Sequence, residues 1–195
     1  MSSLRVFVDS DAIISSLISD RGAAYFLLNK KLPKIRFFIS NASFKEQKIV
    51  VKRLKINKKR FQGLIKKRLT IVRLEKSIDQ LKKKYQAYTL DPDDAHVVAG
   101  AQKSKAKFLI TYNQRHFRKD KIKKDLGILL LTPAQFLQYL RSRGQKINNN
   151  FYSPPAPHCA CLTSKAGKKF GSSHKKPPSL KYGAGYLLEL HPFLV

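Results

Sequence analysis

The chain has 195 residues, 43% of them hydrophobic, which is enough for one cored domain with a short appendage. Lys and Arg number 40 against 12 Asp and Glu, and the net charge of +28 favours a polyanionic partner, most commonly nucleic acid. A lysine-rich composition that merely coats the surface is the alternative. No apolar run reaches the roughly 18 residues of a membrane span, so no membrane partner is expected.

The N-terminal residues MSSLRVFVDS do not have the pattern of a signal peptide. The two cysteines, Cys159 and Cys161, lie outside the patterned part of the chain, and their spacing fits no common zinc motif. They indicate no disulfide framework, and we therefore expect a cytoplasmic protein.

The first part of the chain alternates short apolar runs with longer amphipathic ones. Residues 5–9, RVFVD, are β-branched and aromatic and predict a buried strand. The next apolar residues predict two helices at 12–19 and 22–30. A second strand is predicted at 34–40, and residues 41–68 are predicted to be mostly helical.

The same alternation continues toward residue 143. A third strand is predicted at 69–74 and is followed by a polar helical stretch. A helix at 91–106 precedes the fourth strand at 107–111, and the fifth strand is predicted at 127–132. The last predicted helix, at 133–143, has proline in its first turn.

Nearly continuous apolar strands that alternate with helices are typical of a parallel sheet covered on both faces. We therefore predict a three-layer α/β/α sandwich with a mainly parallel central sheet over residues 1–144. Residues 145–195 are rich in Pro, Ser, Gly, Asn and Lys, have no sustained period, and predict a basic, disordered tail. Only seven lysines and one glutamate lie from residue 146 onward, so the positive charge belongs mainly to the predicted domain.

The acidic residues near the predicted strand ends are the candidates for a functional site. Ligands of such folds gather at the carboxyl ends of the strands, and Asp9 ends the first strand. Ser10 or Asp11 can cap the helix that follows, which leaves Asp9 without a structural explanation. Asp11 remains open between a helix cap and a functional carboxylate.

Three carboxylates are crowded into the stretch LDPDDAHVVAG. Asp91 followed by proline predicts a capped helix start, and the first turn of a helix favours negative charge. Asp94 shares a helix face with Val97 and Val98, the stripe that packs on the sheet, so we expect Asp94 to point inward. Asp93 lies about 100° away around the helix and is expected to be solvated.

Other polar side chains leave more than one interpretation open. Glu46 lies about 200° from Phe44, off the core-facing stripe, and is either solvated and paired with lysines of its helix or functional. Thr111 and Asn113 follow the fourth strand, where either can bind a metal-bound water or a phosphate oxygen; Asn113 can also cap a short helix. His116 is either a base or a surface residue.

Taken together, these motifs resemble the PIN-domain family of metal-dependent ribonucleases, which includes the VapC-like toxins of bacterial toxin–antitoxin pairs. The matching stretches span residues 4 to about 143. They are VFVDSDAIISSLIS, ISNASFKEQ, LDPDDAHVVAGAQKSKAKFLITYNQRHF and LLLTPAQFLQYL.

The resemblance implies a site of three or four carboxylates at the end of the sheet. By the motif match, Asp9, Glu46 and Asp94 would be catalytic and would bind Mg²⁺ or Mn²⁺, hard cations that prefer oxygen ligands. Asp11 is an additional candidate ligand. Holding like charges together raises their pKa values, and a cation would relieve that repulsion.

The fourth acidic position of the family departs from the pattern. It falls on Asn113, and the acid that members with Asn there often carry three residues later falls on His116. Thr111, Asn113 and His116 would then position water or phosphate, with Asn113 counted among the catalytic residues.

The predicted function is hydrolysis of RNA phosphodiester bonds by a metal-dependent endoribonuclease, as a toxin held in check by a protein antitoxin. A homodimer is compatible with this interpretation. The region from residue 45 to residue 84 contains 16 Lys or Arg against three acids, which predicts contacts to the RNA backbone, although a solvated helical face is the alternative. The residues predicted for these contacts are Lys52, Arg53, Lys58, Lys59, Arg60, Lys66 and Lys67.

Two other functions remain open. Asn113 and His116 in place of acids would suit a catalytically impaired PIN-fold protein that only binds RNA. A receiver-like or phosphatase-like α/β domain also gathers acids at strand ends. That class needs a lysine after a late strand and a short phosphoacceptor loop, and the sequence shows neither clearly.

Overall fold

A computed structural model describes residues 3–30, 32 and 34–144, so the predicted tail at 145–195 lies outside the described residues. Five strands form one sheet in the order β3-β2-β1-β4-β5, and every neighbouring pair is parallel. The strands are β1 (Leu4–Val8), β2 (Ile35–Ser40), β3 (Leu69–Val72), β4 (Phe108–Ile110) and β5 (Leu129–Leu131). The predicted parallel sheet is confirmed.

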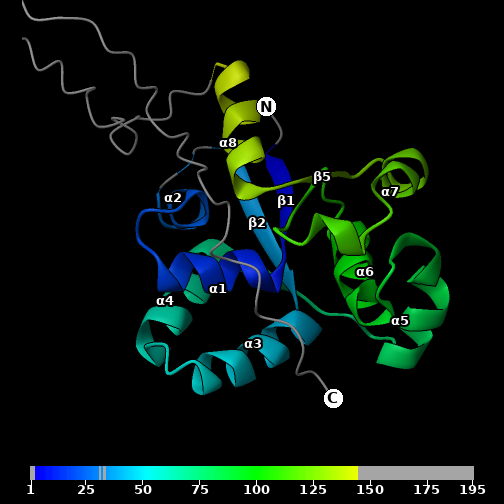
Figure 1. Cartoon of the computed structure of the whole chain (residues 1–195), viewed down its shortest axis with the longest axis horizontal. Coiled ribbons are helices and arrows are strands. Elements are labelled where there is room, and N and C mark those ends of the chain that lie inside the picture. Colours follow the sequence, from blue (N-terminus) through cyan, green and yellow to red (C-terminus); the bar gives the residue numbers. More distant parts are fainter. Residues whose placement is uncertain (1–2, 31, 33, 145–195) are drawn as a thin grey trace, which may run out of the picture. The chain divides into compact units, whose positions relative to one another are not determined.

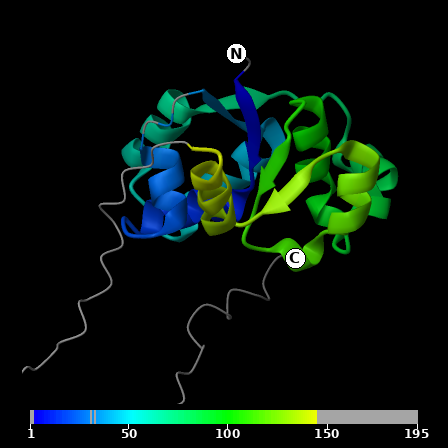
Figure 2. The same ribbon diagram turned by 90° about the horizontal axis from the view of Figure 1, so that it is seen from above.

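Helices cover both faces of this sheet, which confirms the three-layer α/β/α sandwich (Figures 1 and 2). One face packs against α1 (Ser10–Ile18), α2 (Ala23–Asn29), α3 (Asn41–Arg53), α4 (Lys58–Arg68) and α8 (Pro133–Ser142). The other packs against α5 (Ile78–Tyr85), α6 (Ala95–Lys103) and α7 (Lys119–Leu126). None of the described helices is long and apolar enough to cross a membrane.

Strand β1 shows why the sequence of the strands is almost wholly apolar. Val6 and Val8 belong to the core between the sheet and α1, whereas Phe7 belongs to the core beneath α6. Successive side chains of a strand point to opposite faces, so both sets must be apolar when both faces are covered.

Several predicted elements have different boundaries in the structure, and for two of them the structure shows the reason. The helical region 41–68 is two helices, because the chain turns at Lys55, whose φ is 53°, and Asn57 caps α4 by accepting a hydrogen bond from the Arg60 amide at 3.1 Å. The third strand ends at Val72, before the predicted end. Beyond that point the Leu74 amide donates to Asn41 Oδ1 at 2.8 Å, so its hydrogen-bond acceptor is a side chain and not a carbonyl of the neighbouring strand.

The order of the strands creates a switch point between β1 and β4. The chain builds outward from β1 through β2 to β3, and then returns to the other side of β1 to add β4 and β5. Val8 pairs with Ile110, and the Asp9 amide donates to the Ile110 carbonyl at 2.9 Å. Ligand sites of open α/β sheets form at such a point, outside the carboxyl ends of the strands.

Gly100 allows α6 to lie close to β1. A Cβ atom at this position would come within 2.5 Å of Phe7 Cζ, closer than real contacts allow. Helix α6 begins just after Asp94, so this close packing also sets the position of Asp94 relative to the strand ends.

We expect Gly100→Ala to lower the free energy of unfolding by about 1–3 kcal/mol, because the added methyl group forces Phe7 out of its packed position. Urea unfolding monitored by circular dichroism measures the change. The matched control is Gly63→Ala in α4, where the added Cβ meets nothing within 4 Å and the helix propensity of alanine should leave stability equal or higher. Equal stabilities of Gly100→Ala and the wild type would contradict the packing argument.

Candidate active site

Asp9 lies at the carboxyl end of β1 and is buried, with 8% of its surface exposed. It is the N-cap of α1, because its Oδ1 accepts a hydrogen bond from the Ser10 amide at 2.6 Å. The expectation that Ser10 or Asp11 caps this helix is therefore wrong. Burial and the nearby charge of Asp94 raise the pKa of Asp9 to about 6, against the lowering effects of the Ser10 amide, His96 and Thr111.

Asp11 anchors the loop that follows β4. Its Oδ2 accepts hydrogen bonds from the Thr111 hydroxyl at 3.0 Å and from the amides of Tyr112 and Asn113 at 2.8 and 3.0 Å. Burial, together with the charge of Asp9, raises the pKa of Asp11 to about 7. Its other oxygen, Oδ1, is buried and has no hydrogen-bond partner among the described residues.

The two residues predicted to follow β4 are arranged by this anchor. Thr111 is fully buried, and its hydroxyl, besides donating to Asp11, accepts a hydrogen bond from the Asn113 amide at 3.0 Å. The side-chain amide of Asn113 lies 2.8 Å from His116 Nδ1. The loop thus extends the site from Asp11 to His116.

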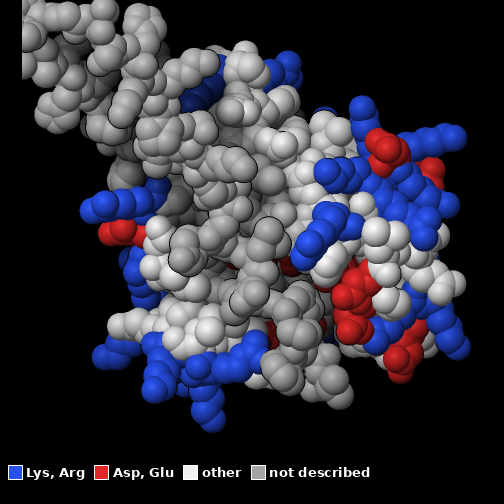
Figure 3. Space-filling view, in the orientation of Figure 1, with Lys and Arg blue, Asp and Glu red and all other residues white. Residues whose placement is uncertain are grey.

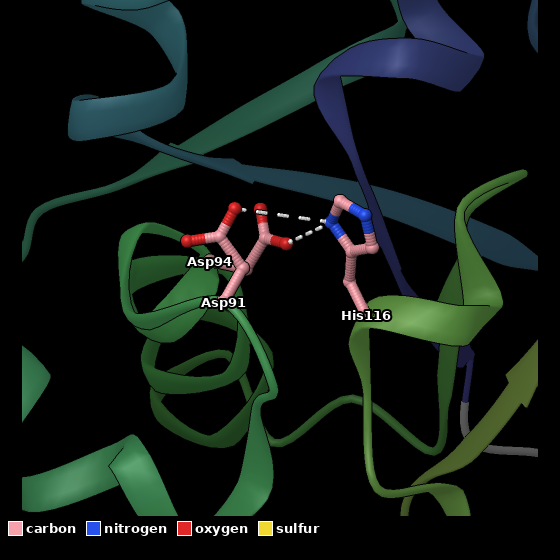
Figure 4. A group of neighbouring side chains, drawn as sticks. All are labelled: Asp91, Asp94 and His116. Atoms are coloured by element: carbon pink, nitrogen blue, oxygen red, sulfur yellow. Dashed lines mark hydrogen bonds and ion pairs between the residues drawn. The ribbon is translucent and has the colours of Figure 1, made fainter. Parts of the chain in front are cut away.

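Asp91, Asp94 and His116 form the tightest group of possible metal ligands in the described part of the chain (Figure 4). One ligand atom from each lies within 4.8 Å of the others. His116 Nδ1 is 3.0 Å from Asp94 Oδ2 and 4.0 Å from Asp91 Oδ2. Burial raises the pKa of Asp94, and the hydrogen bond from His116 opposes this shift.

Backbone hydrogen bonds bring this group together from two separate segments. The Leu90 amide donates to the His116 carbonyl at 2.7 Å, and the Arg118 amide donates to the Tyr88 carbonyl at 2.9 Å. Between them, Thr89 and Phe117 form an antiparallel bridge. These bonds place the short 3-10 helix Gln114–His116 directly beside Asp91 and Asp94.

The three carboxylates of LDPDDAHVVAG separate as the helix geometry indicated. Asp91 caps the 3-10 helix Pro92–Asp94 by accepting from the Asp93 amide at 2.9 Å. The side chain of Asp93 is 72% exposed and pairs with Lys82 at 2.6 Å, whereas that of Asp94 is only 25% exposed. The expected α-helix begins one turn late, at Ala95, because this capped 3-10 turn precedes it.

Glu46 projects from α3 toward α6 and ends beside His96. Its Oε2 lies 3.3 Å from His96 Nε2, and the side chain is 53% exposed. The pairing with lysines of its own helix does not form in the structure. Glu46 also stands outside the close group of Asp91, Asp94 and His116.

His96 is the residue of this region that the sequence analysis missed. It is 6% exposed, and its Nδ1 lies 2.7 Å from the Asp93 carbonyl oxygen. Burial lowers the pKa of His96, but Glu46, the Asp93 carbonyl and Asp9 raise it more, so the net shift is upward. The only sequence signal was a histidine two positions after Asp94, on the helix predicted to pack against the sheet.

The basic residues predicted to contact RNA are all exposed. They lie on the last turn of α3 and along α4, where Figure 3 shows Lys and Arg side chains gathered. Arg68 differs from this group, because its guanidinium is half-buried and donates to the backbone carbonyls of Leu28 and Lys30. The exposed cations thus remain available on this surface, while Arg68 ties α4 to the end of α2.

Residues 5–115, more than half of the chain, match the family model described as PIN domain. The chain belongs to the PIN domain family. PIN domains are nucleases that use divalent metals, and Asp91, Asp94 and His116 form a possible metal site in this chain. The family assignment sets aside the receiver-like or phosphatase-like alternative.

The PIN fold of this chain also aligns with chains of solved toxin–antitoxin complexes. VapBC2 from Rickettsia felis bound to a DNA fragment from its promoter has 15% identity and a TM-score of 0.47, covering 66% of this chain and 98% of that one. A complex from Klebsiella pneumoniae has 22% identity and a TM-score of 0.47, covering 66% and 97%. VapBC-1 from nontypeable Haemophilus influenzae has 16% identity and a TM-score of 0.46, covering 67% and 99%. No curated protein sequence matches the chain significantly.

The PIN-domain carboxylates should make stability depend on pH. The raised pKa values of Asp9, about 6, and Asp11, about 7, mean that the folded state holds protons that the unfolded chain releases near pH 4. Ionisation therefore destabilises the metal-free protein as the pH rises from about 4 to about 7. We expect the free energy of unfolding to fall across this window, as measured by urea unfolding at several pH values.

Asp11→Asn should flatten this pH dependence, because it removes one titrating group and its repulsion with Asp9. Asp93→Asn is the matched control, since Asp93 is exposed and should leave the slope of the wild type unchanged. The attribution would be refuted by a slope in Asp11→Asn as steep as that of the wild type.

Proposed function

We propose that this PIN-domain protein is a metal-dependent endoribonuclease that hydrolyses RNA phosphodiester bonds. The observation that supports the proposal is the close group of Asp91, Asp94 and His116, together with the buried Asp9 at the carboxyl end of β1, within a chain of a nuclease family. The clustering of buried carboxylates at this edge is costly unless a cation joins them.

The side chains at this edge fit a hard divalent cation. Asp9 and Asp94 have raised pKa values caused by burial and by neighbouring carboxylates, and Asp11 Oδ1 is a buried oxygen without a partner. Mg²⁺ or Mn²⁺ would be held by Asp9, Asp94 and Glu46, with Asp11 and His116 as further candidates. When bound, such a metal lowers the pKa of a water molecule and polarises the scissile phosphate.

Other residues of the chain would prepare the site for the substrate. Asp11 holds the backbone amides of Tyr112 and Asn113 in one orientation, so the Asn113 side chain is presented at the edge of the site. His116 holds Asp94 and stands near Asp91. Asn113 and His116 would orient water or phosphate, and Thr111 would act through its bond to Asp11.

The exposed lysines and arginines of α3 and α4 would bind the RNA backbone. Helix α4 has no acidic residue, and Glu46 is the only one in α3. Such a surface binds through the release of counterions, with steep salt dependence and little reading of the base sequence. Single-stranded or looped RNA is the substrate class that we propose, because unstacked nucleotides can enter a site at the edge of a sheet.

The order of motifs in the chain, similar to that of VapC-like toxins, supports the role of a toxin restrained by a protein antitoxin. A cytoplasmic location belongs to the same proposal, and a homodimer is compatible with it. A small antitoxin-like reading frame next to the gene is the expected finding. Growth arrest on expression, relieved by the product of that frame, would test the role directly.

Asp94→Asn should lower RNA cleavage by at least about 100-fold, which corresponds to roughly 2.7 kcal/mol of barrier, because it removes a ligand charge at the centre of the site. The assay follows cleavage of single-stranded RNA in Mg²⁺ or Mn²⁺, and chelation should abolish activity. Asp93→Asn, a change of the exposed neighbour, should retain wild-type activity. Robust cleavage in chelator, or unchanged cleavage by Asp94→Asn, would rule out the mechanism.

A second candidate function is RNA binding without cleavage. It is favoured by Asn113 and His116, which stand where the family pattern has acids, and by the hydrogen bond that joins their side chains. Tight binding of RNA by the wild type, with no cleavage in either metal, would select this function.

Lys58→Gln combined with Lys59→Gln should reduce the salt dependence of RNA binding. Each lost phosphate contact to a single strand lowers the slope of log affinity against log salt by about 0.7. Binding is measured in the Asp94→Asn background, so that the RNA stays intact. The paired control changes Lys123 and Lys124 of α7 to Gln, which removes equal charge from another exposed helix. Equal effects of the two pairs would argue against a specific RNA surface on α4.

A further inference from the structure

His96 is buried at the site, and the proposed function gives it no role. The carbonyl oxygen of Asp93 can only accept, so His96 Nδ1, 2.7 Å away, donates to it. This bond fixes the ring on α6 and directs Nε2 toward Glu46, whose Oε2 is 3.3 Å away. Burial of the ring, 6% exposed, leaves it little freedom to turn away.

Glu46 depends on this contact for its orientation. Helix α3 offers it no cation three or four positions away, because those positions are Ala42, Ser43, Ile49 and Val50. In the described part of the chain, His96 is the ion-pair partner of Glu46. A glutamate that is 53% exposed would otherwise sample many rotamers and reach the site only part of the time.

The ring of His96 thus faces the Asp93 carbonyl with one nitrogen and the Glu46 carboxylate with the other. Residues that hold a ligand in place in this way commonly change metal affinity about 10–100-fold when they are replaced.

We propose that His96 is a positioning residue, which holds the Glu46 carboxylate at the metal site from a ring fixed on the Asp93 carbonyl. This inference rests on the proposed function, because it assumes that Glu46 is a metal ligand. In this role His96 binds neither substrate nor metal. It lowers the cost of ordering Glu46 when a cation binds, so the site is partly formed beforehand.

Two substitutions of His96 separate this role from general packing. Asn places its amide nitrogen close to the position of Nδ1, so His96→Asn keeps a donor for Asp93 but cannot reach Glu46. Gln places its amide nitrogen close to the position of Nε2, so His96→Gln keeps a donor for Glu46. The readout is the affinity of the full-length protein for Mn²⁺, measured by electron paramagnetic resonance without RNA.

We expect His96→Asn to weaken Mn²⁺ binding at least about 10-fold and His96→Gln to stay within about 3-fold of the wild type. In a Glu46→Gln background, His96→Asn should cause no further loss, because the residue through which it acts is gone. Asp93→Asn, which keeps the backbone carbonyl, is the control and should bind as the wild type does. Wild-type affinity in His96→Asn, or an equal loss with and without Glu46, would overturn the proposal.

Cleavage measured in parallel separates this inference from the proposed function. One outcome is that the wild type cleaves RNA but His96→Asn binds Mn²⁺ as tightly as the wild type does. This would overturn the role of His96 alone. Mn²⁺ binding with the expected dependence on His96 and Glu46 but without cleavage would overturn the nuclease function alone. A wild type that binds no Mn²⁺ would overturn both.

If His96→Asn does not fold, the imidazole ¹⁵N resonances of His96 provide the test. They should shift in Glu46→Gln and when Mg²⁺ is added to the wild type, and unchanged resonances would overturn the proposal.

Discussion

The parallel pairing of β1 with β4 is the constraint on which the site depends. Val8 pairs with Ile110, and the hydrogen bond from the Asp9 amide to the Ile110 carbonyl continues this pairing to the strand ends. Because the two strands run in the same direction, residues separated by about a hundred positions leave the sheet at one edge. Asp11 then binds the start of the loop after β4, through the amides of Tyr112 and Asn113.

Charge is distributed in opposite ways on the surface and at the site. Exposed cations cover α4 and the end of α3, whereas the edge of the sheet gathers carboxylates whose ionisation is opposed by burial. Two histidines lie among these carboxylates, His116 against Asp94 and His96 against Glu46. These contacts offset only part of the repulsion between the carboxylates. A bound divalent cation would relieve the rest.

Much of the fold could be predicted because local patterns determined it. Apolar runs predicted all five strands. The helix period predicted that Asp93 is solvated and that Asp94 points inward, and the exposures of the two side chains agree. The roles of Asp9 and Asp11 could not be assigned in this way. The sequence pattern assigned the helix cap to Ser10 or Asp11, whereas in the structure Asp9 caps the helix and Asp11 accepts from three donors beyond β4.

The sequence by itself determined the class of fold, the sign of the surface charge and the separation of Asp94 from the solvated Asp93, since each depends on residue type and spacing within one element. Only the tertiary structure decided which side chains meet. The contacts of His116 with Asp94 and of His96 with Glu46 join elements that approach through packing, α6 against β1 and α3 beside α6. No period within a single element encodes such distances, because they follow from how the helices settle on the sheet.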